Sequence, residues 1–155
     1  MEKTRIEDVD SWMGPAAVKR PLSKALGAEN VALNYYELAP GETFGFGYHR
    51  HPDPEELFYV VEGVATFETE DGDVTVDAGE AIRFAPGEWQ WGRNDSDERV
   101  IALALGAPAD AGDAEIRRHC PDCGSRQSVH IEATEDRDAL LVICDECGAE
   151  VAREK

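Results

Sequence analysis

The sequence predicts an all-β protein, because short runs rich in β-branched and aromatic residues follow one another from Val31 to residue 106. Pro-Gly, Asp-Gly and Asn-Asp pairs separate these runs, and no stretch longer than about ten residues has a helical period before residue 107. All four cysteines follow residue 119. These observations predict an antiparallel barrel or sandwich, followed by a small cysteine-containing domain. The expected strands contain VALNYYEL, YHRH, ELFYVVEG, VATFETEDGDVTV, EAIRFAP, EWQWG and RVIALALG.

Changes in composition divide the chain into four expected segments. The first contains Trp12 and the breakers Gly14 and Pro15, which indicate an irregular arm with one helical turn. The run APADAGDA consists of small and acidic residues, which is typical of a linker. The stretch that follows is too short to build an adequate hydrophobic core alone, so its fold needs an additional stabilising constraint. The expected segments are an N-terminal arm (residues 1–26), a barrel (27–106), a linker (107–116) and a cysteine-containing domain (117–155).

The composition combines enough apolar residues for a core with a strongly acidic balance. Hydrophobic residues make up 42% of the 155 residues, which is enough to fill a barrel. The 33 acidic residues outnumber the 15 basic ones and give a net charge of −18. This bias resembles cytosolic proteins of salt-accumulating archaea and predicts a halophilic protein, with a merely acidic mesophilic protein as the alternative. The charge argues against nucleic acid as a partner and favours a bound cation.

The beginning of the sequence predicts a cytoplasmic protein. The segment MEKTRIEDVDSW is charged and contains no apolar signal region. No apolar run approaches the roughly 18 residues that a transmembrane helix needs. We therefore expect no membrane partner.

The four cysteines have the spacing of a metal site. Cys120-x2-Cys123 and Cys144-x2-Cys147 stand in the similar frames CPDCG and CDECG. A Cys-x-x-Cys turn directs two thiolates at one tetrahedral ion about 2.3 Å away, and the Gly that follows lets the backbone curl around it. Two such turns on a short antiparallel sheet resemble the zinc ribbon, which implies a structural Zn²⁺ without an open position. Disulfides or a redox-active motif are the alternatives, and an intracellular chain without a βαβ context disfavours both.

A second candidate metal site lies in the segment HRHPDPEELFYVVEG. Alternate residues of a strand point to one face, so His49 and His51 can both enter the barrel. After a Pro-Asp-Pro turn, Glu56 opens the next strand with an inward side chain, whereas Glu55 would point outward. Two imidazoles and one carboxylate form a facial triad for Fe, Mn, Ni, Zn or Cu. A barrel whose polar centre only orders water or an organic ligand is the alternative.

The spacing His49-x-His51-x4-Glu56-x6-Gly63, with Pro-Gly before it, resembles the first cupin motif. The segment GEAIRFAPGEWQWGRN is similar to the second motif, and the resemblance covers roughly residues 31–106. It implies a double-stranded jelly-roll barrel whose mouth holds a divalent metal, Mn, Fe, Ni or Zn. It also implies small-molecule chemistry or binding above that metal.

The second motif departs from the family pattern at its customary histidine, which is Gln90 here. A strand over EWQWG points Gln90 inward, so its amide oxygen is the expected fourth ligand and favours harder ions such as Mn²⁺ or Fe²⁺. Trp89 and Trp91 would face the other way and pack on the arm or form a dimer interface. Weaker candidates for contact with an organic ligand are Tyr36, Tyr48 and Arg83.

Two functional hypotheses follow from these sites. In the first, the chain is an enzyme whose His-His-Glu-Gln centre acts on a small polar molecule by oxygenase-type or Lewis-acid chemistry. The two expected ligands are the only histidines before residue 119, so a reaction that needs a strong base would have to use a Tyr, a Glu or metal-bound hydroxide. In the second, the barrel is a non-catalytic sensor of a metal or metabolite, and the ribbon docks on a protein partner. A ribbon that only stabilises the C-terminal part or a homodimer is the third possibility.

Overall fold

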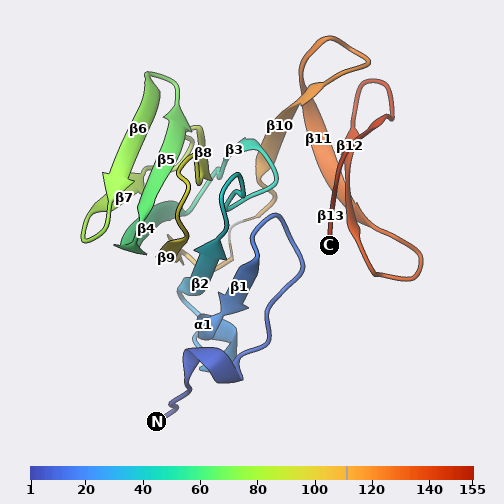
Figure 1. Cartoon of the computed structure of the whole chain (residues 1–155). Coiled ribbons are helices and arrows are strands. Elements are labelled where there is room, and N and C mark those ends of the chain that lie inside the picture. The colour runs from blue at the N-terminus through green and yellow to red at the C-terminus, as the bar shows by residue number, and fades with distance from the viewer. Residues whose placement is uncertain (111) are drawn as a thin grey trace.

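The computed structural model describes residues 1–110 and 112–155, and short strands dominate this part of the chain (Figure 1). Its helical elements are the single turns η1 (Ile6–Asp8) and α1 (Leu22–Ala25), and none of its helices is long and apolar enough to cross a membrane. The all-β prediction is confirmed. The strands are β1 (Val18–Pro21), β2 (Ala32–Leu38), β3 (Tyr48–Arg50), β4 (Glu55–Glu62), β5 (Val64–Thr69), β6 (Gly72–Asp77), β7 (Ala81–Phe84), β8 (Gln90–Arg93), β9 (Val100–Ala107), β10 (Glu115–Cys120), β11 (Ser125–Ala133), β12 (Leu140–Cys144) and β13 (Glu150–Glu154).

Within the described residues, the strands form two antiparallel sheets. One sheet has the order β1-β2-β9-β4-β7, and the other has the order β13-β12-β11-β10-β3-β8-β5-β6. From β4 to β9 the chain crosses between the sheets repeatedly: β4, β7 and β9 lie in the first, and β5, β6 and β8 lie in the second. This winding is that of a jelly roll, and it leaves an interior lined by alternate residues of each strand.

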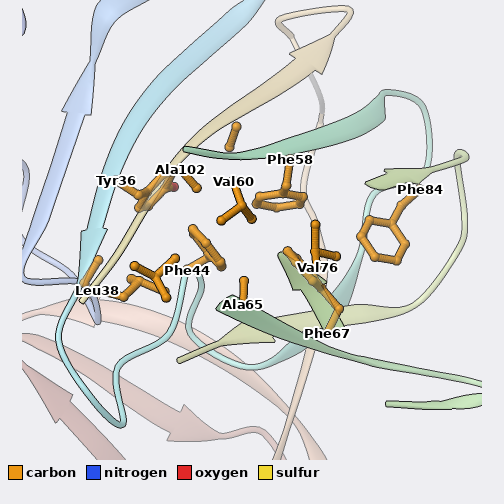
Figure 2. Close-up of a cluster of buried hydrophobic side chains, with 13 residues drawn as sticks. Tyr36, Leu38, Phe44, Phe58, Val60, Ala65, Phe67, Val76, Phe84 and Ala102 are labelled. Carbon is orange, nitrogen blue, oxygen red and sulfur yellow. The ribbon is translucent and has the colours of Figure 1, made fainter. Parts of the chain in front are cut away.

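The barrel core is aromatic at its centre (Figure 2). The ring centroids of Phe58 and Phe67 are 4.9 Å apart, and those of Phe44 and Phe67 are 5.7 Å apart. Gly92 is required beside these rings, because a Cβ atom there would lie 2.5 Å from Cε1 of Phe67 and 2.6 Å from Cδ2 of Phe44. The rings therefore fill one end of the barrel and form the floor of the site described below.

The N-terminal segment contains a strand that the sequence did not indicate. β1 pairs with β2, and Lys19 lies directly opposite Tyr36. The backbone N–H of Ala17 donates to Oε2 of Glu42 over 2.7 Å, and the N–H of Thr43 donates to the carbonyl of Pro15 over 3.4 Å. An irregular arm was expected here, but the free edge of β2 offers backbone partners that a single sequence does not reveal.

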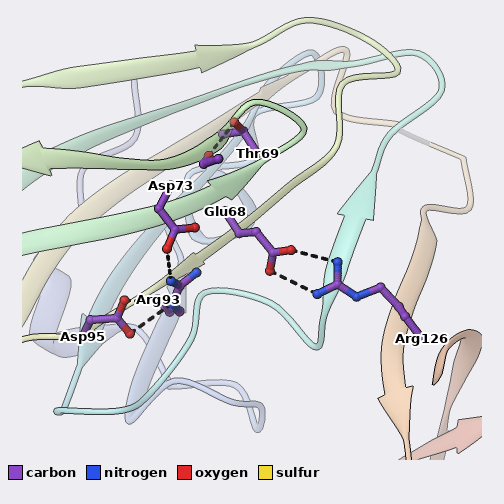
Figure 3. Close-up of polar contacts among 7 residues, drawn as sticks. Glu68, Thr69, Asp73, Arg93, Asp95 and Arg126 are labelled. Carbon is purple, nitrogen blue, oxygen red and sulfur yellow. Dashed lines mark hydrogen bonds and ion pairs between the residues drawn. The ribbon is translucent and has the colours of Figure 1, made fainter. Parts of the chain in front are cut away.

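The C-terminal strands continue the second barrel sheet. β10 pairs with β3, so the cysteine-containing hairpins stand beside the barrel and share its hydrogen-bonded ladder (Figure 1). The guanidinium of Arg126 on β11 forms two hydrogen bonds, of 2.8 and 3.2 Å, with the carboxylate of Glu68 on β5 (Figure 3). The expected linker, residues 107–116, includes residue 111, which lies outside the described residues. The expected division into segments stays a prediction.

Candidate metal centre

A cavity of about 280 Å³ lies between the two sheets, and Phe44 and Phe58 of the aromatic cluster form part of its lining. It exists because the inward positions of β9 carry Ala104 and Gly106, which fill little space. Phe58 and Glu56, their cross-strand neighbours on β4, line the wall beside them. The lining is mainly apolar, with a few convergent polar groups, which is the composition expected of a small-molecule site.

The structure brings together the two histidines and the glutamate that the sequence pattern singled out. Oε2 of Glu56 lies 3.9 Å from Nε2 of His49 and 3.6 Å from Nε2 of His51. The imidazole planes cross at 83°, with ring centroids 5.2 Å apart. One potential ligand atom from each residue lies within 4.8 Å of the other two. Histidines at alternate positions and a carboxylate at the start of the facing strand therefore converge on one point inside the barrel.

Gln90 completes this cluster from the second sheet. It pairs in register with His49, and its side chain is 1% exposed. Its Nε2 donates to Oε2 of Glu56 over 2.9 Å and lies 3.0 Å from Nε2 of His49. The amide thus reaches the point on which the three other side chains converge. Its Oε1 is buried without a hydrogen-bond partner among the described residues, so a 180° turn of the amide would direct that oxygen at the same point.

The segment before β3 orients the His49 ring. Nδ1 of His49 lies 2.8 Å from the carbonyl oxygen of Gly47, which can only accept, so Nδ1 carries the proton and Nε2 keeps its lone pair. Gly45 passes so near that a Cβ atom there would lie 3.1 Å from Cε1 of this ring. The glycines of the GFGY segment therefore hold the imidazole with its lone pair directed into the cluster.

Burial and the neighbouring charges set the protonation of this cluster. Burial lowers the pKa of His51; Glu56 partly opposes this, and the neighbouring His49 adds to it. Burial alone would raise the pKa of Glu56, but the two histidines and the amide of Gln90 outweigh it and lower the pKa. The cluster therefore favours a neutral His51 and an ionised Glu56, which are the forms that bind metals.

These residues fit a divalent transition metal. Two imidazole nitrogens, a carboxylate oxygen and an amide oxygen are a donor set for such an ion, and the buried Oε1 of Gln90 has no other use in the described structure. His49, Glu56 and Gln90 lie on β3, β4 and β8, and His51 directly follows β3. The two histidines and Glu56 also line the cavity, so an ion held by them would be accessible to a ligand there.

The four cysteines form a separate cluster at the turns of the C-terminal hairpins. The Sγ atoms of Cys120 and Cys147 are 3.6 Å apart, and those of Cys123 and Cys144 are 3.9 Å apart. All four Sγ atoms lie within 4.8 Å of one another, and none is in a disulfide. After each Cys-x-x-Cys turn a glycine has positive φ and returns a hydrogen bond of 2.9 Å to the first cysteine. This geometry is compatible with a tetrahedral thiolate site and a zinc ribbon.

One of the three expected contacts for an organic ligand lines the cavity. Tyr36 is buried and lies in the cavity wall. Tyr48 lies outside this lining, because its ring stacks on Trp89 with centroids 5.1 Å apart. Arg83 is exposed and forms an ion pair with Glu55. The structure therefore does not bring Tyr48 or Arg83 to the cavity, and their expected contact with a ligand has no support from their positions.

The two tryptophans beside Gln90 pack against the first strand of the C-terminal part. Trp89 is buried, and the guanidinium carbon of Arg117 lies 4.4 Å from its ring centroid. Nε1 of Trp91 donates to the carbonyl of Gly45 over 3.1 Å, and Arg118 lies 5.5 Å from its ring centroid. Contact with the arm or a second copy was expected. The chain itself supplies the cover instead, because β10 crosses this face.

Sequence reasoning missed Lys19, which lines the cavity from β1. Its position follows from the register: Lys19 lies opposite Tyr36, and directly paired residues of antiparallel strands point to the same face. Because Tyr36 faces the interior, Lys19 does too. A local signal for this was absent, since the pairing joins segments that are distant in the sequence.

Comparison with known proteins identifies the barrel. Residues 34–106 match the cupin domain, whereas no curated protein sequence matches the chain. A sugar phosphate isomerase of the cupin superfamily from Silicibacter pomeroyi has a TM-score of 0.63 at 17% identity, over 93% of this chain and 88% of that one. The polyketide cyclase RemF from Streptomyces resistomycificus has a TM-score of 0.61 at 23% identity, over 74% of this chain and 83% of that one.

A predicted oxalate decarboxylase from Thermotoga maritima has a TM-score of 0.60 at 19% identity, over 69% of this chain and 99% of that one. At such identities the likeness shows the fold alone. The jelly-roll prediction and the resemblance to the two cupin motifs are thereby confirmed. Residues 34–106 of this chain match the cupin domain, and the barrel has the fold of the cupin structures.

Proposed function

We propose that this chain is a metal-dependent cupin that acts on a small polar molecule at a centre formed by His49, His51, Glu56 and Gln90. The observation that carries the proposal is the convergence of these four side chains on one point in the wall of a cavity. A bound Mn, Fe, Ni or Zn ion would supply Lewis-acid or oxygen chemistry there. Cys120, Cys123, Cys144 and Cys147 hold a structural Zn²⁺ in this proposal.

The residues around the centre have separate roles in this proposal. Glu56 and the two imidazoles hold the ion, and Gln90 supplies a neutral oxygen that leaves the centre more positive than a second carboxylate would. Burial and the charge of Glu56 raise the pKa of Tyr36, so its hydroxyl stays protonated and can donate to a ligand oxygen. Phe58 and Ala104 form apolar wall that excludes water from the reacting group.

The three structural relatives carry names of different reactions: a sugar phosphate isomerase, a polyketide cyclase and an oxalate decarboxylase. Because these names differ, the fold does not select one reaction, and we argue the reaction class from the set of metal-binding side chains. A centre with open positions and little protein base beside it favours oxygenase-type or simple Lewis-acid chemistry.

A metal assay tests the two sites. The purified protein should carry about one thiolate-bound zinc and about one chelator-labile ion per chain. The double variant His49→Ala and His51→Ala should lose only the labile ion. The matched control is His119→Ala with His130→Ala, which removes the two remaining histidines and should keep both ions. A double variant at 49 and 51 that retains its full metal content would end the proposal for the barrel.

Activity is tested on the metal-loaded protein. Oxygen consumption and product formation should be followed with a panel of diols, thiols and keto acids, and the double variant at His49 and His51 is the negative control. Turnover that this variant abolishes supports an enzyme. Binding of panel members without any turnover would favour the non-catalytic module that senses a metabolite. A cytoplasmic location, a homodimer and a protein partner of the ribbon stay predictions.

A further inference from the structure

Lys19 is the one basic side chain among the described residues that line the cavity. Its backbone is fixed on both sides: its N–H donates to Oγ of Ser11 over 3.0 Å, and its carbonyl accepts from Trp12 over 2.7 Å. The pairing of Lys19 with Tyr36 then directs its side chain inward. Lys19 on β1 and Glu56 on β4 thus extend from the same face of one sheet, and β2 and β9 lie between their strands.

The ammonium of Lys19 rests on aromatic faces. Nζ lies 5.8 Å from the ring centroid of Trp12 and 5.7 Å from that of Tyr36. Within the described part of the chain it forms no ion pair. Burial lowers the pKa of Lys19, and Glu56 only partly offsets this. Lys19 is half-buried, so an ammonium without an ion-pair partner there carries a desolvation cost that an anionic ligand would offset.

The two acidic side chains of the cavity do not meet this need. Glu55 is paired with Arg83 on the outer side of β4. Oε2 of Glu56 accepts a hydrogen bond from Gln90 and faces the two histidines. With a divalent ion on Glu56, the cavity would carry a net positive charge in a protein whose net charge is −18. Such a cavity selects anions by its local field, whatever the charge of the outer surface.

We infer that Lys19 binds the carboxylate of a small monocarboxylic acid with a largely apolar body, whose opposite, polar end faces His49, His51 and Glu56. The second half of this statement and the net positive charge of the cavity rest on the proposed function, whereas the unpaired ammonium of Lys19 does not. A single ammonium matches a monoanion, whereas a phosphate dianion would keep a buried charge without a partner. The apolar walls, including Phe46 and Phe58, match a hydrocarbon body better than a sugar.

Calorimetric titration of the full-length protein tests the inference, with benzoate, hexanoate, benzamide and phenyl phosphate as probes. Benzoate or hexanoate should bind more tightly than benzamide and phenyl phosphate. Lys19→Met should weaken carboxylate binding at least ~10-fold and leave benzamide unchanged, because it removes charge but little volume. Lys19→Arg should retain most of the affinity. Lys24→Met is the matched control, since Lys24 contacts the same Trp12 ring from α1, and it should bind as the unchanged protein does.

A thermal unfolding measurement separates an anchor from a structural lysine. Lys19→Met should unfold at the same temperature as the unchanged protein or higher, because it removes a half-buried charge without an ion-pair partner. Carboxylates should raise the unfolding temperature of the unchanged protein but not that of Lys19→Met. A loss of stability in both Lys19→Met and Lys19→Arg would show a structural role and overturn the inference.

Repeating the titration in the His49→Ala, His51→Ala background distinguishes this inference from the metal proposal. A preference for benzoate over benzamide that still depends on Lys19 supports the anchor, even if the barrel binds no ion. Equal binding of benzoate and benzamide, tighter binding of phenyl phosphate, or no carboxylate binding at millimolar concentration would each overturn it. Metal content is measured on the same samples, so failure of the metal site is seen separately.

Discussion

Gln90 places an amide where an imidazole would bind a borderline divalent ion more tightly. Its carbonyl oxygen can reach the point shared by His49 and Glu56 only if the amide turns from the orientation in which Nε2 donates to Glu56. We expect Gln90→His to raise the affinity for Zn²⁺ or Ni²⁺ about tenfold relative to Mn²⁺. Gln90→Leu should weaken binding of every ion. Competition against a chromophoric chelator measures both effects, and a leucine variant with unchanged affinity would exclude Gln90 as a ligand.

The two histidines with shifted pKa values should titrate on opposite sides of the ordinary value. Burial lowers the pKa of His51, whereas the hydrogen bonds that His130 donates to Asp145 and Glu132 raise the pKa of His130. In metal-free protein, ring NMR signals of His51 should change at lower pH than those of His130. The reverse order would contradict the burial of His51 in this cluster.

The same shifts give opposite contributions to stability. For His51 the folded-state pKa lies below the unfolded value near 6.5, so its contribution is present above that value and is lost as the pH falls through the folded pKa. For His130 the folded-state pKa lies above it, so its contribution is present below the unfolded value and is lost as the pH rises through the folded pKa.

Strand β10 joins the two candidate metal sites. Its first residues pair with β3, with Ile116 opposite His49, and its last residue is Cys120. Ile116 also lines the cavity, and Arg118 donates to the carbonyl of Phe46 over 2.9 Å. The strand that ends in one of the four clustered cysteines therefore also supports the strand that carries His49.

Removal of the thiolate site should weaken the barrel site through this strand. We expect Cys123→Ser with Cys147→Ser to lose the zinc, to increase amide hydrogen exchange in β10 and β3, and to lower barrel-ion affinity ~10-fold. The control, Asp122→Ala, alters the same turn without removing a thiolate and should change none of these. Unchanged exchange in β3 after loss of the zinc would show that the two sites are independent.

At the scale of the whole molecule, charge is the dominant feature. With 33 acidic and 15 basic residues, repulsion opposes the folded state at low ionic strength, whereas each exposed ion pair contributes only about 0–1 kcal/mol. The unfolding temperature should therefore rise as KCl increases towards about 1 M, where the Debye length is about 3 Å. An equal osmolality of sucrose is the control. A temperature that falls with KCl would contradict the halophilic prediction.

Local patterns could be read from the sequence, and contacts between distant segments could not. His49-x-His51 and the two Cys-x-x-Cys pairs are short-range spacings, and strand alternation or a turn suffices to bring their side chains together. Lys19 enters the cavity only because β1 adds to the edge of β2. Trp89 is buried only because β10 lies over it with Arg117. The position of Tyr48 also depends on a contact between distant segments, since the sequence does not tell which strand will cover its ring.

The pairing of β10 with β3 also governs how the molecule meets other molecules. Without residues 108–155, β3 would present unsatisfied backbone N–H and C=O groups, and the faces of Tyr48 and Trp89 would meet solvent. Such an exposed strand edge is a template for strand addition. A chain without these residues should therefore self-associate in sedimentation experiments more than the full chain does at equal concentration. The C-terminal hairpins thus cover the edge of β3 within the same chain, and this pairing opposes aggregation.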